Sequence, residues 1–225
     1  MKISGHSDIG RERKDNQDAF YLGENWAVIA DGMGGHNGGE IASNATVAAI
    51  KTYLDKEIIE IIPEIKEAIN LANEIVLELG TGNQGGMGTT AVLAFVSDKA
   101  YIASVGDSRA YLIREDEITQ VTTDHTIVNT LLEIGTITEN QVGTHPQKNI
   151  LTRAVGTDSK LEIDTFEVSL QKGDVILMCT DGLYNAISDI EILELIRAGA
   201  ETKAMCELAS KRSGRDNCTV VKVEV

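Results

Sequence analysis

Two short apolar segments of the chain each end at an aspartate that is followed by glycine. Residues 26–30 precede Asp31, and residues 175–180 precede Asp181. An apolar run that stops at Asp-Gly is typical of a buried strand with one carboxylate at its tip. Such a carboxylate needs a positive partner, because burying it unpaired is costly, and a bare glycine carbonyl is a further ligand for a hard cation. The repeated pattern predicts that Asp31 and Asp181 converge on one metal site.

Further aspartates stand at predicted strand edges or in tight turns, namely Asp18, Asp107 and Asp216. Taken singly, Asp107 is most often just part of a turn. Asp31 alone is equally typical of a cap on a helix that begins near Asn37 or Gly38. As a cluster, such carboxylates cannot all stay ionised without cations between them, and an all-oxygen set favours magnesium or manganese over zinc. Two such ions can share a water, lower its pKa and present hydroxide to a phosphorus atom.

Arg13 is a basic residue that lies five residues before Asp18, one of the aspartates of the cluster. It is either a counter-ion or a ligand that grips a phosphate with two parallel hydrogen bonds. We interpret His125 and His145 as loop histidines, because no third soft ligand accompanies them. The glycine-rich segment 81–88 is not a nucleotide loop, since it follows a helix, precedes a strand and contains no lysine.

The apolar periodicity predicts alternating strands and helices. Strands are expected at residues 2–7, 18–21, 26–30, 89–97, 99–105, 109–114, 117–121, 161–170, 174–179 and 218–225, and helices at 38–56, 63–79, 127–134, 188–197 and 202–210. The strands between residues 89 and 121 are joined by short turns and predict an antiparallel meander. Residues 161–170 and 174–179 are expected to pair with each other. Residues 124–156 form the least regular part, and insertions of this length are often functional.

Composition favours one large domain of 225 residues without a linker. The three cysteines lie in regular segments and fit buried reduced thiols. The net charge of −15 argues against a nucleic-acid partner. The first residues lack a signal-peptide core, and no apolar run approaches the ~20 residues of a membrane span. We therefore expect a cytoplasmic protein without a membrane partner.

Six short motifs occur in the order and spacing of a known enzyme family. They are Arg13-x-x-Asn16-Gln17-Asp18, Asp31-Gly32-Met33-Gly34-Gly35-His36, Gly88-Thr89-Thr90, Val105-Gly106-Asp107-Ser108-Arg109, Thr180-Asp181-Gly182-Leu183 and Asp216-Asn217. From about Ser7 to Val223 the chain resembles the metal-dependent serine/threonine protein phosphatases of the type 2C class, the PPM family, in its bacterial branch. The resemblance implies an α+β fold, a four-layer αββα sandwich of two antiparallel sheets flanked by helices. It also implies a single catalytic domain, 1–225, with a flap insertion at about 123–153 that selects substrates.

The resemblance also implies a role for each acidic residue. Asp31 bridges two metal ions and the Gly32 carbonyl completes one of them, Asp181 and Asp216 hold the other, Asp107 with Asp181 forms a weaker third site, and Asp18 mainly holds metal-bound waters. The cofactors implied are Mn²⁺ or Mg²⁺, two per subunit with room for a third. Arg13 binds the substrate phosphate, so that Arg13, Asp31 and Asp181 are the predicted catalytic residues.

One position departs from animal relatives, which carry a proposed general acid where this chain has Met33. His36 does not simply inherit that role, because a general acid must reach the leaving oxygen. The acid therefore stays unassigned, with metal-bound water as the default.

The reaction implied is hydrolysis of phosphoserine and phosphothreonine in proteins by a metal-bridging hydroxide, without a covalent phosphoenzyme. The expected partners are phosphorylated proteins, a cognate bacterial Ser/Thr kinase and its substrates, and the expected state is a monomer. An alternative is a phosphatase of the same fold dedicated to a regulatory target, such as an anti-sigma-factor antagonist or a secretion-system component. A non-catalytic regulator would lack the metal carboxylates, and a structural calcium site is not supported by any Asp-x-Asp-x-Asp-Gly loop.

Overall fold

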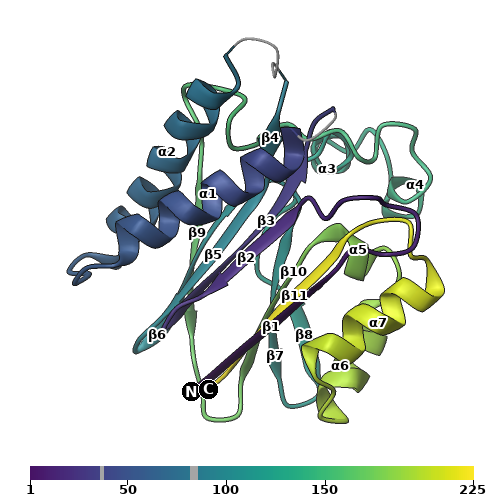
Figure 1. Cartoon of the computed structure of the whole chain (residues 1–225). Coiled ribbons are helices and arrows are strands. Elements are labelled where there is room, and N and C mark those ends of the chain that lie inside the picture. Colours follow the sequence, from purple (N-terminus) through teal and green to yellow (C-terminus); the bar gives the residue numbers. More distant parts are fainter. Residues whose placement is uncertain (36–37, 82–85) are drawn as a thin grey trace.

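The computed structural model describes residues 1–35, 38–81 and 86–225, whose strands form two antiparallel sheets (Figure 1). Sheet 1 has the order β1 (Lys2–Asp8), β11 (Cys218–Glu224), β10 (Val175–Cys179), β7 (Arg109–Arg114) and β8 (Glu117–Gln120). Sheet 2 has the order β2 (Asp18–Leu22), β3 (Trp26–Met33), β5 (Ala91–Val96), β6 (Lys99–Val105) and β9 (Asp164–Ser169), and β4 (Gly88–Thr89) pairs with β3. The first and last strands are neighbours, which places the two chain ends side by side (Figure 1).

Helices cover the outer faces of both sheets (Figure 1). Sheet 2 is covered by α1 (Gly38–Leu54) and α2 (Ile61–Leu79). Sheet 1 is covered by α5 (Asp181–Tyr184), α6 (Asp189–Arg197) and α7 (Thr202–Arg212). A third apolar cluster fills the space between the sheets, with Ile29 and Ile102 from sheet 2 and Ile176 and Val221 from sheet 1. The predicted four-layer αββα sandwich is confirmed.

Burial on both faces explains why β3 is continuously apolar in sequence. Val28 packs into the cluster beneath the helices, whereas the next residue, Ile29, packs into the cluster between the sheets. A strand covered on both sides has no solvent face, so polar residues do not alternate along it. β3 also continues past Asp31 to Met33, beyond its predicted end.

The predicted strand pairings are wrong in two places. β6 and β7 are not neighbours, because the chain passes from sheet 2 to sheet 1 at Gly106, which has a positive φ of 97°. Likewise β9 pairs with β6, whereas β10 pairs with β7 and β11. Short turns between apolar runs indicate neighbours along the chain, but in a sandwich a short turn also serves to change sheets. Asp107 consequently lies at a crossing between the sheets.

The helical predictions hold with small shifts of boundary. The predicted capping box of α6 is present, with Ser188 Oγ accepting from Glu191 N (3.4 Å) and Glu191 Oε2 accepting from Ser188 N (3.0 Å). All three cysteines are buried and free, as predicted. In the described part of the chain, no helix is both long and apolar enough to cross a membrane.

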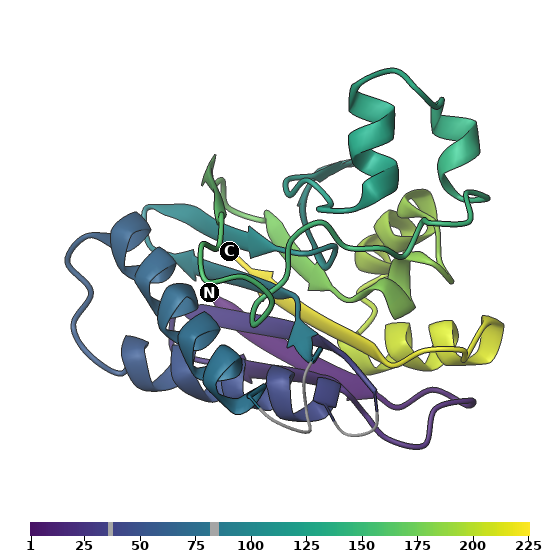
Figure 2. The ribbon, with the colours of Figure 1, turned by 90° about the horizontal axis from the view of Figure 1, so that it is seen from above.

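The flap, residues 123–153, stands beside the sheets as a separate lobe (Figure 2). It contains the predicted helix α3 (Ile127–Glu133) and an additional short helix, α4 (Glu139–Val142). Its neck is closed by backbone hydrogen bonds from Ile127 N to Ile150 O and from Thr152 N to His125 O, both 2.9 Å long. His125 N also donates to Gly106 O over 2.9 Å, so the root of the lobe lies next to the crossing that carries Asp107.

Candidate active site

The predicted site residues meet at one end of the sandwich. A cavity of about 300 Å³ is lined by Arg13, Asp31, Gly32, Asp107, Asp181 and Asp216. These residues come from separate loops and strand ends, as the sequence pattern predicted. Asp18 lies beside them, directly opposite Asp31 in the register of β2 and β3.

Asp18 is held by two threonines and keeps one oxygen unpaired. Its Oδ2 accepts hydrogen bonds from Thr180 Oγ1 (2.9 Å) and Thr219 Oγ1 (2.7 Å). Its Oδ1 is buried and has no hydrogen-bond partner among the described residues. Burial raises the pKa of Asp18 to about 6, although both threonine hydrogen bonds oppose the shift. The side chain thus presents a fixed, unsatisfied oxygen to the cluster.

Asp31 has a backbone fixed from both sides. Its N–H donates to Thr90 Oγ1 (2.9 Å), and its carbonyl accepts from Thr89 Oγ1 (2.8 Å). Burial, followed by repulsion from Asp18 and Asp181, raises the pKa of Asp31 well above its usual range. α1 begins at Gly38, as predicted, whereas the other predicted start, Asn37, lies outside the described residues.

Only glycine fits after Asp31. A Cβ at Gly32 would overlap the carbonyl of Gly39 and lie 2.6 Å from Gln17 O. The Gly32 N–H donates to the same Gln17 oxygen over 3.1 Å. Close packing against the start of α1 therefore fixes the Gly32 peptide at the cavity wall.

Asp107 and Asp181 bring the carboxylates of sheet 1 to the cavity. Burial, followed by the charge of Asp124, raises the pKa of Asp107 to about 6. Burial, followed by repulsion from Asp216 and Asp107, raises the pKa of Asp181 to about 7. Asp181 Oδ2 accepts from Asn185 Nδ2 (3.1 Å), and its Oδ1 is buried without a hydrogen-bond partner in the described chain.

Asp216 forms an ion pair with Arg13 at the rim of the cavity. Arg13 Nη2 donates to Asp216 Oδ2 over 2.7 Å, and both side chains are partly exposed. The neighbouring Asn217 is buried and ties three segments together, because its Oδ1 accepts from Gln17 N (2.9 Å) and its Nδ2 donates to Ile9 O (2.9 Å). In this structure Arg13 is the counter-ion of Asp216. Because Arg13 also lines the cavity, its guanidinium could contact a phosphate bound there.

The sequence did not identify the residues that orient the carboxylates. Thr180, at the start of α5, and Thr219, in β11, bind Asp18, and Asn217 joins the Asp216 loop to the segment before Asp18. Thr180 and Asn217 are members of the quoted motifs, next to Asp181 and Asp216, whereas Thr219 lies outside them in β11. Polar residues inside otherwise apolar strands were the available signal.

The donor set fits divalent cations. The cavity wall offers carboxylate oxygens and a glycine carbonyl, which are the ligands that Mg²⁺ and Mn²⁺ prefer. Two buried carboxylate oxygens, on Asp18 and Asp181, have no hydrogen-bond partner among the described residues. Burial, followed by repulsion between neighbouring carboxylates, raises the pKa of Asp31 and of Asp181, so their ionised forms need a compensating positive charge. Within residues 1–35, 38–81 and 86–225, no three acidic, histidine or cysteine side chains already form a closed cage.

Stability of the ion-free protein is expected to fall as pH rises from about 4, the ordinary aspartate pKa, to about 7. Asp18, Asp107 and Asp181 have folded-state pKa values of about 6, 6 and 7. Because these values lie above the unfolded-state value, the folded protein binds more protons in this window, and each ionisation destabilises it. A cation reverses this penalty, so stabilisation by Mn²⁺ should increase with pH. Thermal unfolding in chelator and in Mn²⁺ at several pH values measures both trends, and a flat ion-free profile would contradict them.

Arg109 links the flap to the carboxylate cavity. Its Nε and Nη2 donate to Asp124 over 3.0 and 2.7 Å, and its guanidinium lies 3.7 Å from the centre of the Tyr184 ring. The Tyr184 hydroxyl in turn donates to Asp107 O over 3.1 Å. One stacked guanidinium therefore connects the flap root, the Asp107 turn and the helix that begins at Asp181.

Arg109→Lys is expected to lower activity at limiting Mn²⁺ by about tenfold and to be partly rescued by excess Mn²⁺, because lysine keeps the charge but loses the paired hydrogen bonds and the stack. Arg114→Lys is the matched control. Arg114 lies on the same strand and binds Asp174 through two hydrogen bonds of 3.0 and 2.6 Å, away from the cavity. Equal effects of both substitutions on Mn²⁺ dependence would contradict the link.

Neither of the two flap histidines lines the aspartate cavity. Buried His125 accepts from Gly106 N through Nδ1 (3.1 Å) and lies 3.2 Å from Asp164 Oδ2 through Nε2. His145 is more exposed, and its Nδ1 accepts from Gln147 N over 3.2 Å. Met33 lines the cavity, whereas His36 lies outside the described residues.

Comparison with known proteins places this arrangement in a family. The model of the protein phosphatase 2C family matches residues 28–220. The chain belongs to the protein phosphatase 2C family. It is 36% identical over 240 residues to protein phosphatase PhpP of Streptococcus pneumoniae, covering 100% of this chain and 98% of that protein.

Solved structures of family members have the same fold. The serine/threonine phosphatase of S. agalactiae superposes with a TM-score of 0.93 at 35% identity, covering 100% of this chain and 99% of that one. The catalytic domain of PstP, solved in complex with two manganese ions, superposes with a TM-score of 0.87 at 32% identity, covering 98% and 96%. The predicted bacterial type 2C assignment is confirmed.

Proposed function

We propose that this chain hydrolyses phosphoserine and phosphothreonine in proteins, with divalent cations held by its aspartate cluster. The observation that carries the proposal is the convergence of the five predicted aspartates, Asp18, Asp31, Asp107, Asp181 and Asp216, at one end of the sandwich. Full-length similarity to bacterial serine/threonine phosphatases supports this general activity over a dedicated regulatory one.

Each residue has a proposed task in that reaction. Asp31, the Gly32 carbonyl, Asp181 and Asp216 are the proposed ligands for two ions, and Asp107 with Asp181 would hold a third. Asp18 is held by its threonines with one oxygen free to orient water. Divalent ions, when bound, neutralise phosphoryl oxygens and lower the pKa of water.

Arg13 is the proposed phosphate ligand. Its guanidinium already binds a carboxylate at the cavity rim, at 2.7 Å from Asp216 Oδ2. A phosphoryl group offers the same kind of paired oxygen acceptors, so Arg13 can exchange one for the other. This contact orients the substrate and stabilises charge that develops on the phosphoryl oxygens. Met33 cannot donate a proton, so protonation of the leaving oxygen is assigned to no protein residue.

The cofactors proposed are Mn²⁺ or Mg²⁺, two per subunit with a weaker third. The oxygen-only donor set supports these ions, and the solved PstP catalytic domain holds two manganese ions. Calorimetric titration of the metal-free protein with Mn²⁺, Mg²⁺ and Ca²⁺ would measure how many ions bind and which ion binds most tightly.

The biological setting proposed is removal of phosphate placed by a cognate bacterial Ser/Thr kinase. We further propose one catalytic domain over 1–225 with the flap at about 123–153, acting as a cytoplasmic monomer. Comparison of the phosphoproteomes of a deletion strain and its parent would identify the substrates.

The proposed activity is tested with p-nitrophenyl phosphate and a phosphothreonine peptide in the presence of Mn²⁺. Hydrolysis of both substrates, with complete loss in excess chelator and recovery on adding Mn²⁺, is the expected result. Hydrolysis that persists in chelator would overturn the metal-dependent mechanism, and failure to hydrolyse either substrate in Mn²⁺ would overturn the activity.

A further inference from the structure

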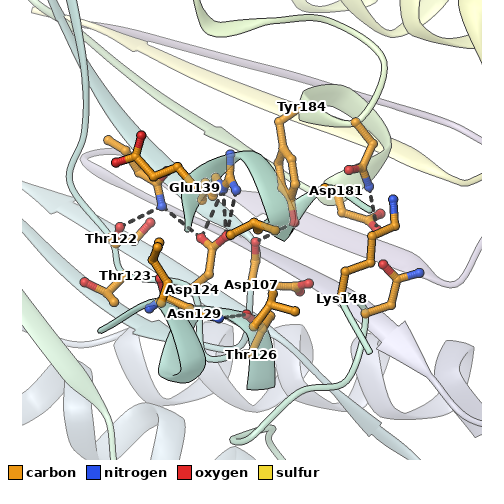
Figure 3. A pocket seen from close by; sticks show the side chains of 18 of the residues that line it. Asp107, Thr122, Thr123, Asp124, Thr126, Asn129, Glu139, Lys148, Asp181 and Tyr184 are labelled. Carbon is orange, nitrogen blue, oxygen red and sulfur yellow. Dashed lines mark hydrogen bonds and ion pairs between the residues drawn. The ribbon is translucent and has the colours of Figure 1, made fainter. Parts of the chain in front are cut away.

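A second pocket of about 850 Å³ adjoins the aspartate cavity, between the flap, β7–β8 and the α5–α6 region (Figure 3). Its lining shares Asp107, Asn149 and Asp181 with the cavity. A polypeptide whose phosphorylated residue enters the cavity therefore places a nearby side chain at this pocket.

The pocket has one apolar wall. Val128, Leu132 and Val142 line it from α3 and α4 of the flap. Apolar carbon at a pocket wall favours the aliphatic part of a ligand. This wall alone would suit the aliphatic stem of lysine as well as leucine. The charged residues that line the pocket therefore determine which kind of side chain it favours.

The remaining walls carry more negative than positive charge. The acidic residues are Asp107, Asp124, Glu139, Asp181 and Asp189, and the basic residues are Arg109 and Lys148. Arg109 and Asp124 neutralise each other at 2.7 Å, and Asp107 and Asp181 are the proposed metal ligands. Glu139 and Asp189 are exposed and have no ion pair in the described part of the chain. Lys148 is the one basic lining residue without an ion pair among the described residues, so the two carboxylates leave the pocket with a net negative charge.

Resting on the proposed function, we propose that this pocket binds a lysine or arginine side chain close in sequence to the phosphorylated residue of the substrate. The aliphatic stem lies along Val128, Leu132 and Val142, and the cation lies near Glu139 and Asp189. Long basic side chains combine these two kinds of surface, whereas an acidic side chain is repelled by the same carboxylates.

A neighbouring groove on the α7 side bears on which side of the aspartate cavity the basic side chain of the substrate binds. It shares Lys148, Asn149 and Asp181 with the pocket but adds Arg215 to its lining. Its charged residues are Lys148 and Arg215 against Asp181 and Asp216, which are both proposed metal ligands, so this groove lacks the further carboxylates that Glu139 and Asp189 give the pocket. The basic residue of the substrate is therefore expected to follow the flap side of the cavity.

The test uses phosphothreonine peptides that differ only in one residue, which is Lys, Gln or Glu at each of the three positions on either side of the phosphothreonine. At one or more positions the kcat/KM of the wild-type protein for the Lys peptide should exceed that for the Glu peptide by about tenfold, as expected for two exposed charge contacts. The preference should shrink at 0.5 M salt, because exposed pairs are screened.

The variant Glu139→Gln/Asp189→Asn should reduce this Lys-to-Glu ratio to about twofold, since it removes both carboxylates while keeping their shape. Glu194→Gln is the matched control, because Glu194 lies exposed on the same helix as Asp189 but does not line the pocket. It should keep the wild-type ratio. p-Nitrophenyl phosphate, which has no flanking residues, is measured in parallel to report the reaction itself.

An active wild-type protein without Lys preference at any position would overturn the pocket assignment and leave the proposed function standing. The same conclusion would follow if Glu139→Gln/Asp189→Asn kept the full preference. If the wild-type protein failed to hydrolyse p-nitrophenyl phosphate in Mn²⁺, the proposed function would be overturned, and the pocket assignment with it.

Discussion

Asp31→Asn is expected to reduce phosphatase kcat by about a thousandfold or more, because Asp31 is a proposed ligand of the ions that neutralise the phosphoryl oxygens and lower the pKa of water. Asparagine keeps the shape of the side chain, and the backbone bonds of residue 31 to Thr89 and Thr90 do not depend on its charge. What disappears is the carboxylate that faces Asp18 across the strand pair and repels Asp181. The loss should therefore be chemical and not conformational.

The same substitution is expected to stabilise the ion-free protein at pH 8. Burial and neighbouring carboxylates raise the pKa of Asp31 well above its usual range, so its ionised form costs folding free energy. Removing the charge should recover on the order of 1–3 kcal/mol, while stabilisation by Mn²⁺ should largely vanish. A substitution that raises stability while it lowers activity is expected at a functional site.

Activity on p-nitrophenyl phosphate and thermal unfolding, each with Mn²⁺ and with chelator, measure the two effects. Asp55→Asn is the control, because Asp55 is exposed at the end of α1 and remote from the aspartate cavity. Full activity of Asp31→Asn would remove Asp31 from the reaction. A destabilised ion-free variant would show that Asp31 stabilises the fold instead.

The site was more predictable than the sheet topology for a physical reason. A carboxylate at the end of an apolar strand, such as Asp31 or Asp181, is costly wherever the strand lies, so its need for a cation is visible in the local sequence. The partner of a doubly buried strand is set by tertiary packing, which local sequence does not encode. The meander prediction failed at Gly106 for that reason.

Supporting polar residues were harder to predict because their role depends on register. Thr180 and Thr219 reach Asp18 only because β10 and β11 are neighbours and β2 approaches them from the other sheet. Asn217 similarly acts on segments about two hundred residues away in the chain. A threonine next to or within an apolar strand is common for reasons unrelated to function. Only the folded sandwich shows that these two threonines bind Asp18.

Gly182→Ala is expected to destabilise the protein by about 3 kcal/mol and to reduce activity severely, because overpacked sites force the backbone to move. A Cβ on Gly182 would overlap the carbonyl of Asn217 and lie 3.1 Å from the Cα of Cys218. Asn217 follows Asp216 directly and binds Gln17 N. Displacing it would therefore disturb the cavity from both sides.

The control for this prediction is Gly143→Ala on the flap. Nothing lies within 4 Å of a Cβ placed there, and Gly143 has a φ of −63°, which alanine adopts readily. That substitution should change stability by less than about 1 kcal/mol. Denaturant unfolding with chelator measures both variants without any contribution from a cation. If Gly182→Ala unfolded at the wild-type midpoint, the glycine after Asp181 would not be needed for packing, and the Asp-Gly pair would owe its presence to the aspartate alone.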